Sequence, residues 1–325
     1  NKRCYACHGA LKRNAGLRLD TVELMTRGGD GGPAIEAGNS EESLIVEAVI
    51  GGNGLKMPPE GEAAPFSPQE IALLRGWIDQ GAKAPLDEKP QPDPRKHWSF
   101  RPPVAAEVPH LTGERAAWVT TPIDAFLAKR QEERGLTPRP SASPRELIRR
   151  VYLDLVGILP TDDDVRAFAD NPSESAYEAI VDRLRASPQY GERWGRHWMD
   201  VWRYSDWDGF GGEIRESQPY IWHWRDWIVE SLNADRPYDQ MIVQMLAADE
   251  ATPDDPQALR ATGYLARNWY KFNRNSWLDS TIEHTAKAFL ALTLNCARCH
   301  DHKYDPVSQA DYYRFRAFFE PHNTR

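Results

Sequence analysis

The chain carries Cys4-Tyr5-Ala6-Cys7-His8 near its start and Cys296-Ala297-Arg298-Cys299-His300 near its end. These two stretches hold all 4 Cys of the 325 residues, and both read Cys-x-x-Cys-His. Thiols at this spacing reach the two vinyl groups of one porphyrin, and the following His shares a face of the helical turn and aims at the iron. The pattern is the attachment signature of c-type haem. It predicts two covalent haems, on Cys4 and Cys7 and on Cys296 and Cys299, with His8 and His300 as iron ligands.

Two other uses of paired cysteines compete with haem. In one alternative the two pairs together form a four-thiolate zinc site, and in the other a single pair forms a structural or redox disulfide. Neither explains the His after each pair. With 9 His in 325 residues, two such neighbours arise by chance on the order of once in a thousand. A small disulfide-stapled scaffold is excluded, because 4 Cys are too few for this length.

Length and composition narrow the class of protein. The 325 residues are enough for two domains, and 41% hydrophobic residues with 12 Trp provide a folded core. The balance of 40 Lys and Arg against 48 Asp and Glu gives a net charge of −8, without the basic excess of a nucleic-acid-binding protein. No apolar run approaches the roughly 20 residues of a membrane span. We therefore expect no nucleic-acid partner and no transmembrane span in this chain.

The first motif has a candidate ligand for the far face of its iron. Met57 follows in Lys56-Met57-Pro58-Pro59, a loop that its prolines stiffen. A lone Met more often fills a core, but the order of haem motif, polar segment, Met-Pro-Pro and amphipathic helix favours ligation. Met/His ligation raises a reduction potential, which suits electron transfer.

A helix is expected to close this first domain. Ser67 is placed to cap it, Pro68 suits its first position, Glu70 completes a capping box and Gly81 ends it. The apolar face that would cover a haem edge consists of Ile71, Leu74 and Ile78.

Further segments carry a family resemblance. In the first part they are Gly16–Asp20, Gly31–Ile35, Gly38, Ser43–Ile45, Met57–Pro59 and Trp77–Ala82; in the second they are Thr121–Leu127, Arg149–Gly157, Glu192–Asp200 and Cys296–Pro306. On these segments, residues 4–84 resemble the planctomycete-type cytochrome C domain. Residues 97–322 resemble the larger domain of unknown function that follows it in the same family. The resemblance implies an extracytoplasmic haem protein, often longer than this chain, and supplies no substrate. We expect a helix and a signal peptide to be missing before Cys4 and a further domain after Arg325.

Three regions are expected. Residues 1–84 form a small class I-like cytochrome c domain, the proline-dense residues 85–110 form a rigid extended linker, and residues 111–325 form a larger helical domain with the second haem. The predicted fold class is mainly α, because no alternating strand or hairpin signal is present.

Helices of the larger domain are predicted from their start signals and apolar spacing. Thr121 with Asp124, Ser143 with Glu146, and Thr161 with Asp164 mark three starts. The later helices are expected at Ser173–Ser187, Gln189–Tyr204, Pro219–Asn233, Tyr238–Ala247, Gln257–Asn268 and Asp279–Leu294.

The far-face ligand of the second iron stays open. No Met follows His300, so the candidates are His197, His284 and His322, or the position is vacant. His302 is too close to His300 to reach around the ring, so we expect it to line the pocket. A vacant position would make this haem a catalytic centre.

Three further features have competing interpretations. Trp194, Trp198 and Trp202 recur at helical spacing, which favours an aromatic core around the porphyrin over a sugar platform or an electron relay. The loop Asp206–Glu213 is either a turn between helices or a pocket lip. Asp301 and Asp305, which continue the second motif, either hold its loop or bind a cation such as calcium.

Together these features predict a periplasmic or otherwise extracytoplasmic dihaem c-type cytochrome. Its Met-ligated haem would pass electrons between a redox partner protein, or a further haem domain, and the second haem. One alternative is a haem oxidoreductase, peroxidase-like or acting on a substrate such as a carbohydrate, whose second haem is catalytic. Another is a glycan-binding surface protein with structural haem. Whether the chain is an enzyme stays open at this point.

Overall fold

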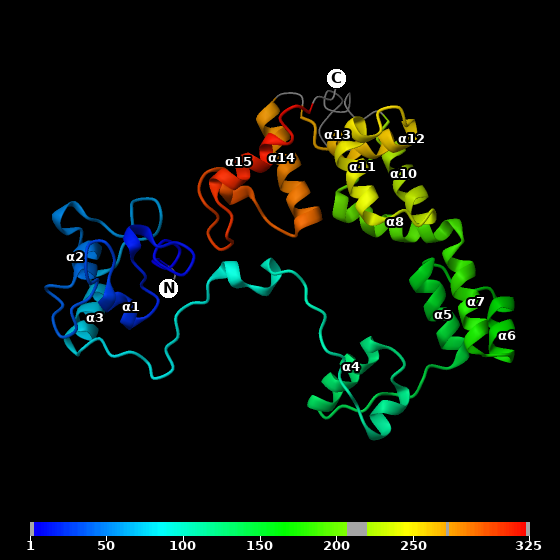
Figure 1. The fold of residues 1–325 in the computed structure, drawn as a ribbon, viewed down its shortest axis with the longest axis horizontal. Coiled ribbons are helices and arrows are strands. Elements are labelled where there is room, and N and C mark those ends of the chain that lie inside the picture. The colour runs from blue at the N-terminus through cyan, green and yellow to red at the C-terminus, as the bar shows by residue number, and fades with distance from the viewer. Residues whose placement is uncertain (1–2, 207–219, 271–272, 323–325) are drawn as a thin grey trace. The chain divides into compact units, whose positions relative to one another are not determined.

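The structure is a computed structural model that describes residues 3–206, 220–270 and 273–322. The regular secondary structure of these residues is helical and includes no strand, only isolated bridges such as that between His8 and Arg13 (Figure 1). The predicted mainly α fold is confirmed. The chain divides into a small unit, Asn1–Val104 with Cys296–Tyr313, and a large unit, Ala105–Asn295 with Arg314–Arg325. The boundaries expected from sequence, at 84 and 110, stay a prediction.

The first part of the small unit is built from short helices around an aliphatic core. Its α-helices are α1 (Val22–Arg27), α2 (Leu44–Ile50) and α3 (Pro68–Asp79), and its 3-10 turns are η1 (Asn14–Gly16), η2 (Gly52–Gly54), η3 (Pro94–Lys96) and η4 (Trp98–Phe100). The residues buried in the core are Ile35, Val46, Ile78 and Ala82. The second Cys-x-x-Cys-His motif lies in the same unit; it begins inside the turn η8 (Asn295–Arg298) and precedes the helix α15 (Gln309–Ala317).

The predicted start of α3 is confirmed in detail. The Ser67 hydroxyl accepts the Glu70 N–H, and the Glu70 carboxylate accepts the Ser67 N–H in return. Both bonds satisfy donors that a helix start would leave unpaired. Ile78 is fully buried and Leu74 packs on the same core, as the apolar spacing indicates.

A buried ion pair ties residue 91 to the first part of the small unit. Arg18 donates from Nε and Nη2 to the Asp20 carboxylate at 2.9 and 2.6 Å, and the Gln91 N–H donates to the same carboxylate at 2.7 Å. The Asp20 side chain has no exposed area. A carboxylate removed from water needs such donors, so the segment after residue 85 is anchored at Gln91.

The large unit holds the longer helices. They are α4 (Pro122–Glu133), α5 (Pro144–Leu155), α6 (Asp162–Asp170), α7 (Glu174–Arg185), α8 (Pro188–Trp202), α10 (Trp222–Asn233), α11 (Tyr238–Ala251) and α14 (Arg274–Thr285), with the turn η5 (Gly113–Trp118) before them. The capping boxes predicted at Thr121, Ser143 and Thr161 are all present. Helices α5, α6 and α7 share a core made of Ile148, Val151, Tyr152, Val156, Phe168 and Leu184.

Two glycines allow α8 to pack closely on α10. A Cβ on Gly191 would lie 2.5 Å from the Val229 carbonyl oxygen, and one on Gly195 would lie 3.2 Å from Val229 Cγ2. The Gly191 N–H also donates to Asn233 Oδ1 at 2.8 Å. The predicted helices Ser173–Ser187, Gln189–Tyr204 and Tyr238–Ala247 match α7, α8 and α11 within a few residues. The predicted Pro219–Asn233 matches α10, although Pro219 itself lies outside the described residues.

Two predicted helices need correction. The expected helix Gln257–Asn268 is three short pieces, α12 (Pro256–Leu259), η6 (Arg260–Thr262) and α13 (Gly263–Ala266). Gly263 lies against the Trp224 ring there, where a Cβ would meet Trp224 Cβ at 2.5 Å.

The expected helix Asp279–Leu294 begins and ends earlier than predicted. It begins at Arg274, because the Asn273 side chain caps it by accepting the N–H groups of Asn275 and Ser276. It continues as a π-turn, η7 (Ala286–Leu290), and stops where Ala291 adopts a φ of 53°. Among the helices in the described parts of the chain, none is long and apolar enough to cross a membrane.

Candidate functional site

The first Cys-x-x-Cys-His motif forms one tight turn. The N–H groups of Cys7 and His8 both donate to the Cys4 carbonyl oxygen, at 3.1 and 2.8 Å. The two thiols are half-buried and form no disulfide. Burial raises the pKa of the Cys4 thiol. The backbone thus closes into one turn from Cys4 to His8, as the spacing predicts.

A mostly apolar cavity of about 500 Å³ opens beside this turn. Cys4, Cys7 and His8 line one part of it, and the apolar lining includes Leu17, Leu19, Ala34, Ile45, Val49 and Phe66. Gly31 and Gly32 also line it, and a Cβ on either would meet nothing within 4 Å. Volume and lining fall within the range of cofactor sites. The open space beside the glycines leaves room for a flat ring.

Met57 lines the same cavity as His8. Its backbone N–H donates to the Ala48 carbonyl oxygen of α2 at 2.8 Å, which fixes the loop to the small unit. The His8 Nδ1 atom is buried without a hydrogen-bond partner among the described residues. Two thiols, an imidazole and a thioether around one apolar cavity are the donor set that a covalently attached haem takes, so the residues present fit that group.

The second motif repeats the turn on the surface of the small unit. The N–H groups of Cys299 and His300 donate to the Cys296 carbonyl oxygen, both at 3.3 Å. Cys296, Cys299 and His300 are all exposed. His300 Nδ1 lies 2.8 Å from the Asp301 carbonyl oxygen. Because a carbonyl only accepts, Nδ1 carries the proton and Nε2 keeps a free lone pair for a metal.

Hydrogen bonds hold the loop after His300. Asp301 accepts the Gln309 N–H at 2.9 Å, and Gln309 donates from its side chain to the Cys299 carbonyl oxygen at 2.9 Å. His302 is buried, and its Nδ1 accepts the Asp305 N–H at 2.9 Å. Asp301 and Asp305 therefore brace the loop. Among the described residues no three His, Cys, Asp or Glu side chains are grouped to hold a metal ion, so the calcium expectation gains no support.

The three candidates for the second far-face ligand all lie in the large unit. His197 is exposed on α8, with its ring 5.7 Å from that of Trp194. His284 on α14 contacts the Arg203 guanidinium through Nε2. Burial, and to a smaller extent the positive charge of Arg203, lowers the pKa of His284 to about 4. His322 packs its ring 4.8 Å from Trp277, and burial lowers its pKa. Ligation by any of the three stays a prediction.

The tryptophans divide between core and surface. Trp202, Trp224 and Trp227 are buried, with Trp198 stacked on Trp202 at 4.9 Å, as an aromatic core requires. Trp194 is 36% exposed and so is only partly in that core. The predicted turn or pocket lip falls on residues 207–213, outside the described residues, apart from Asp206.

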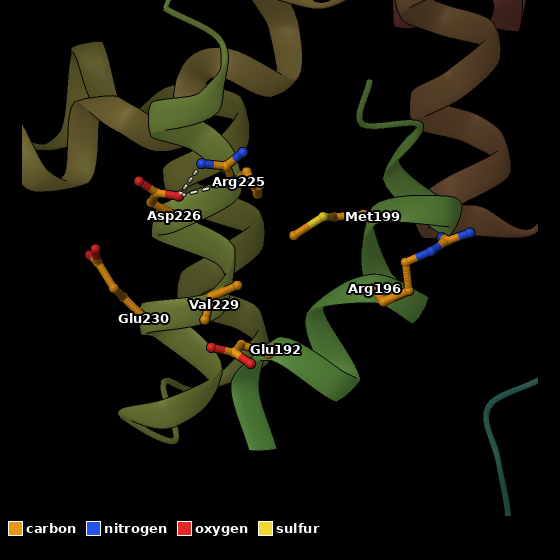
Figure 2. Close-up of a pocket in the computed structure, with 7 residues that line it drawn as sticks. All are labelled: Glu192, Arg196, Met199, Arg225, Asp226, Val229 and Glu230. Carbon is orange, nitrogen blue, oxygen red and sulfur yellow. Dashed lines mark hydrogen bonds and ion pairs between the residues drawn. The ribbon is translucent and has the colours of Figure 1, made fainter. Parts of the chain in front are cut away.

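A groove of about 420 Å³ between α8 and α10 was not found from the sequence. Figure 2 shows Met199 pointing toward α10, with Arg225 and Asp226 joined by an ion pair of 2.9 Å. Glu230 pairs with Arg260 at 2.6 Å. These two ion pairs neutralise Arg225, Asp226 and Glu230 at the groove. The Gly191 and Gly195 spacing was the sequence signal for the close helix pair that forms it.

Comparison with known proteins supports the two regions separately. The family described as "Planctomycete cytochrome C" matches residues 4–61, and the family described as "Protein of unknown function (DUF1549)" matches residues 122–324. No curated protein and no solved structure matches the chain. The first match covers the Cys4 motif and Met57, and the second covers the Cys296 motif.

Proposed function

This chain belongs to the family of unknown function DUF1549 and carries a planctomycete cytochrome C region before it, and from that premise we propose that it is a dihaem c-type cytochrome that transfers electrons. The matched cytochrome C region makes it a c-type cytochrome, for which covalent haem c is the expected cofactor. The second haem and the electron-transfer role are the proposal.

The observation that carries the proposal is the shared cavity of His8 and Met57. The thiols of Cys4 and Cys7, on the same turn as His8, would anchor the porphyrin, while His8 and Met57 would hold its iron. The haem supplies one-electron chemistry when bound, and thioether ligation raises its reduction potential. The apolar lining excludes water, which further favours the less charged reduced form.

The second attachment site is proposed on the repeated motif. Cys296 and Cys299 are exposed and free to react, and the Asp301 carbonyl orients the His300 ring so that Nε2 is available. One attachment site thus lines a cavity, and the thiols of the other lie at the surface of the small unit. We propose that it works outside the cytoplasm with a redox partner protein or a further haem domain.

The exposure of the second motif favours one other function, a haem oxidoreductase. An iron on the exposed His300 without a second protein ligand would be open to a small molecule. Electron transfer alone predicts two six-coordinate irons, whereas the oxidoreductase predicts one open iron.

The test is a visible and EPR spectrum of the purified chain, oxidised and reduced, with and without cyanide or carbon monoxide. The proposal predicts two low-spin haems that cycle reversibly and ignore both added ligands. One high-spin haem that binds them would favour the oxidoreductase. The Cys296→Ser/Cys299→Ser variant assigns that signal, because it retains only the haem at His8. A chain without covalent haem would overturn both functions.

A further inference from the structure

The small unit contains both haem motifs, although they are almost the whole chain apart in sequence. The loop after the second motif also lines the cavity of the first. His300, Asp301 and Lys303 lie on the same cavity wall as Cys4, Cys7 and His8, within this one unit. A ring attached to the first motif would therefore be bounded by the loop that carries the second iron ligand.

One hydrogen bond joins the two motif loops directly. Lys12 donates from Nζ to the Asp301 carbonyl oxygen at 3.3 Å. Lys12 is held in turn, since its carbonyl oxygen accepts the Gly9 N–H at 2.9 Å in the turn that follows His8. The same Asp301 carbonyl oxygen faces His300 Nδ1, so the contact ends on the residue that orients the second imidazole.

Two cations on this cavity have no carboxylate partner among the described residues. Lys12 donates only to a backbone oxygen, and Lys303 lies over the Tyr304 ring at 5.6 Å. Arg3, by contrast, is paired with Glu70 at 3.0 Å. Ammonium groups without anions suit the propionates of a haem, and these two stand where both motif loops meet.

The exposure of the second motif points the same way. Cys296, Cys299 and His300 are all exposed, so a porphyrin held there needs apolar cover that the motif does not provide. Of these three residues, His300 lines the adjoining apolar cavity of the small unit.

From these contacts we propose that Lys12 is a positioning residue that holds the two motif loops together at the cavity, so that haems attached to the two motifs would be close enough to couple electronically. This inference rests on the proposed dihaem function. It adds that the small unit would hold both haems, so that an electron would need no intermediate carrier to pass from one to the other.

Circular dichroism in the Soret band tests this on the full chain with both haems attached. Two neighbouring haems give a bisignate band, because their Soret transitions couple and split into bands of opposite sign. This coupling falls steeply as the distance between the haems increases. We expect that band in the parent chain and its loss in both single-haem variants, Cys4→Ser/Cys7→Ser and Cys296→Ser/Cys299→Ser. Two haems per chain with a spectrum equal to the sum of the two variants would overturn the inference alone. Fewer than two would overturn the proposed function as well.

The role of Lys12 is tested with matched lysine variants. Lys12→Met should weaken the bisignate band without changing haem content or melting temperature. Lys12→Arg, which keeps a cationic donor, should give the band of the parent chain. Lys89→Met is the control, since Lys89 is an exposed lysine of the same unit that is not on the cavity. A Lys12→Met band equal to that of Lys89→Met would contradict the positioning role.

Discussion

Replacing Arg18 with Met should weaken the contact that holds the segment around Gln91 against Asp20 within the small unit. The change removes both guanidinium donors from the Asp20 carboxylate, which has no exposed area, and leaves it only backbone N–H donors such as that of Gln91. Removing one partner of a buried ion pair costs about 3–5 kcal/mol. The Arg18 side chain is 16% exposed, so water can reach part of the space that the guanidinium leaves. We therefore expect this contact to lose about 2–4 kcal/mol of stability. At 1.36 kcal/mol per tenfold, local opening becomes roughly 30 to 1000 times more frequent.

Hydrogen exchange of the Gln91 amide measures this opening in the intact, haem-loaded chain. The matched control is Arg95→Met, because Arg95 also pairs with an aspartate, Asp93, at 2.9 Å, but is 57% exposed. An exposed pair contributes only about 0–1 kcal/mol. If Arg18→Met speeds exchange no more than Arg95→Met does, the account of the buried pair is wrong.

The effect of Arg18→Met should depend on pH with a definite sign. Burial alone would raise the pKa of Asp20, but the hydrogen bonds from Arg18 and the Gln91 N–H hold it below its ordinary value. The stability from this pair is therefore complete above the unfolded pKa, about 4, and is lost as pH falls through the folded pKa. In the variant burial dominates and Asp20 takes up a proton more readily, so the difference from the parent should shrink below pH 4.

Three further predictions concern the haem site and the large unit. Met57→His should leave the first iron six-coordinate but lower its reduction potential, read by spectroelectrochemistry in the Cys296→Ser/Cys299→Ser background; an unchanged potential would exclude Met57 as a ligand. Asp164→Asn should lower the free energy of unfolding by about 1–2 kcal/mol at pH 7, because hydrogen bonds from Thr161 and Arg183 lower the pKa of Asp164 to about 2. This figure is reduced for solvent screening, since the Arg183 side chain is 57% exposed. That cost should disappear between about pH 4 and pH 2 in urea denaturation, and a cost independent of pH would contradict its electrostatic origin. Gly191→Val should lower the free energy of unfolding by about 1–3 kcal/mol, because the added side chain would clash with the Val229 carbonyl oxygen. The control Gly76→Ala, in the interior of α3 with only Gln80 Nε2 nearby at 3.9 Å, should instead stabilise by up to about 1 kcal/mol; equal thermal shifts would refute the packing argument.

Features that depend on a few neighbouring residues were predictable from the sequence. The capping boxes at Ser67, Thr121, Ser143 and Thr161 are local hydrogen-bond patterns, and each is present. The Cys-x-x-Cys-His turns are local in the same sense. The true start of α14 was missed because Asn273 caps it without a Glu or Gln in the capping-box position.

Features that depend on distant residues were not predictable. The division of 256–266 into short helical pieces has no signal in the local sequence, and the close approach of Trp224 to Gly263 joins residues far apart in the chain. The grouping of 296–313 with the first hundred residues, and the bond from Lys12 to Asp301, likewise have no local signature. That Met57 lines the same cavity as His8 was inferred from the order of segments and is seen in the structure, whereas ligation itself stays a prediction.

The number of covalent haems per chain tests the central claim most directly. Mass spectrometry of the denatured, unreduced and reduced chain counts them, because thioether bonds survive both treatments whereas zinc and disulfides do not. The account predicts the mass of the polypeptide plus two haems, falling by one haem in Cys4→Ser/Cys7→Ser and by one in Cys296→Ser/Cys299→Ser. A parent chain that carries no haem, or whose single haem is lost in only one of the two variants, would contradict it.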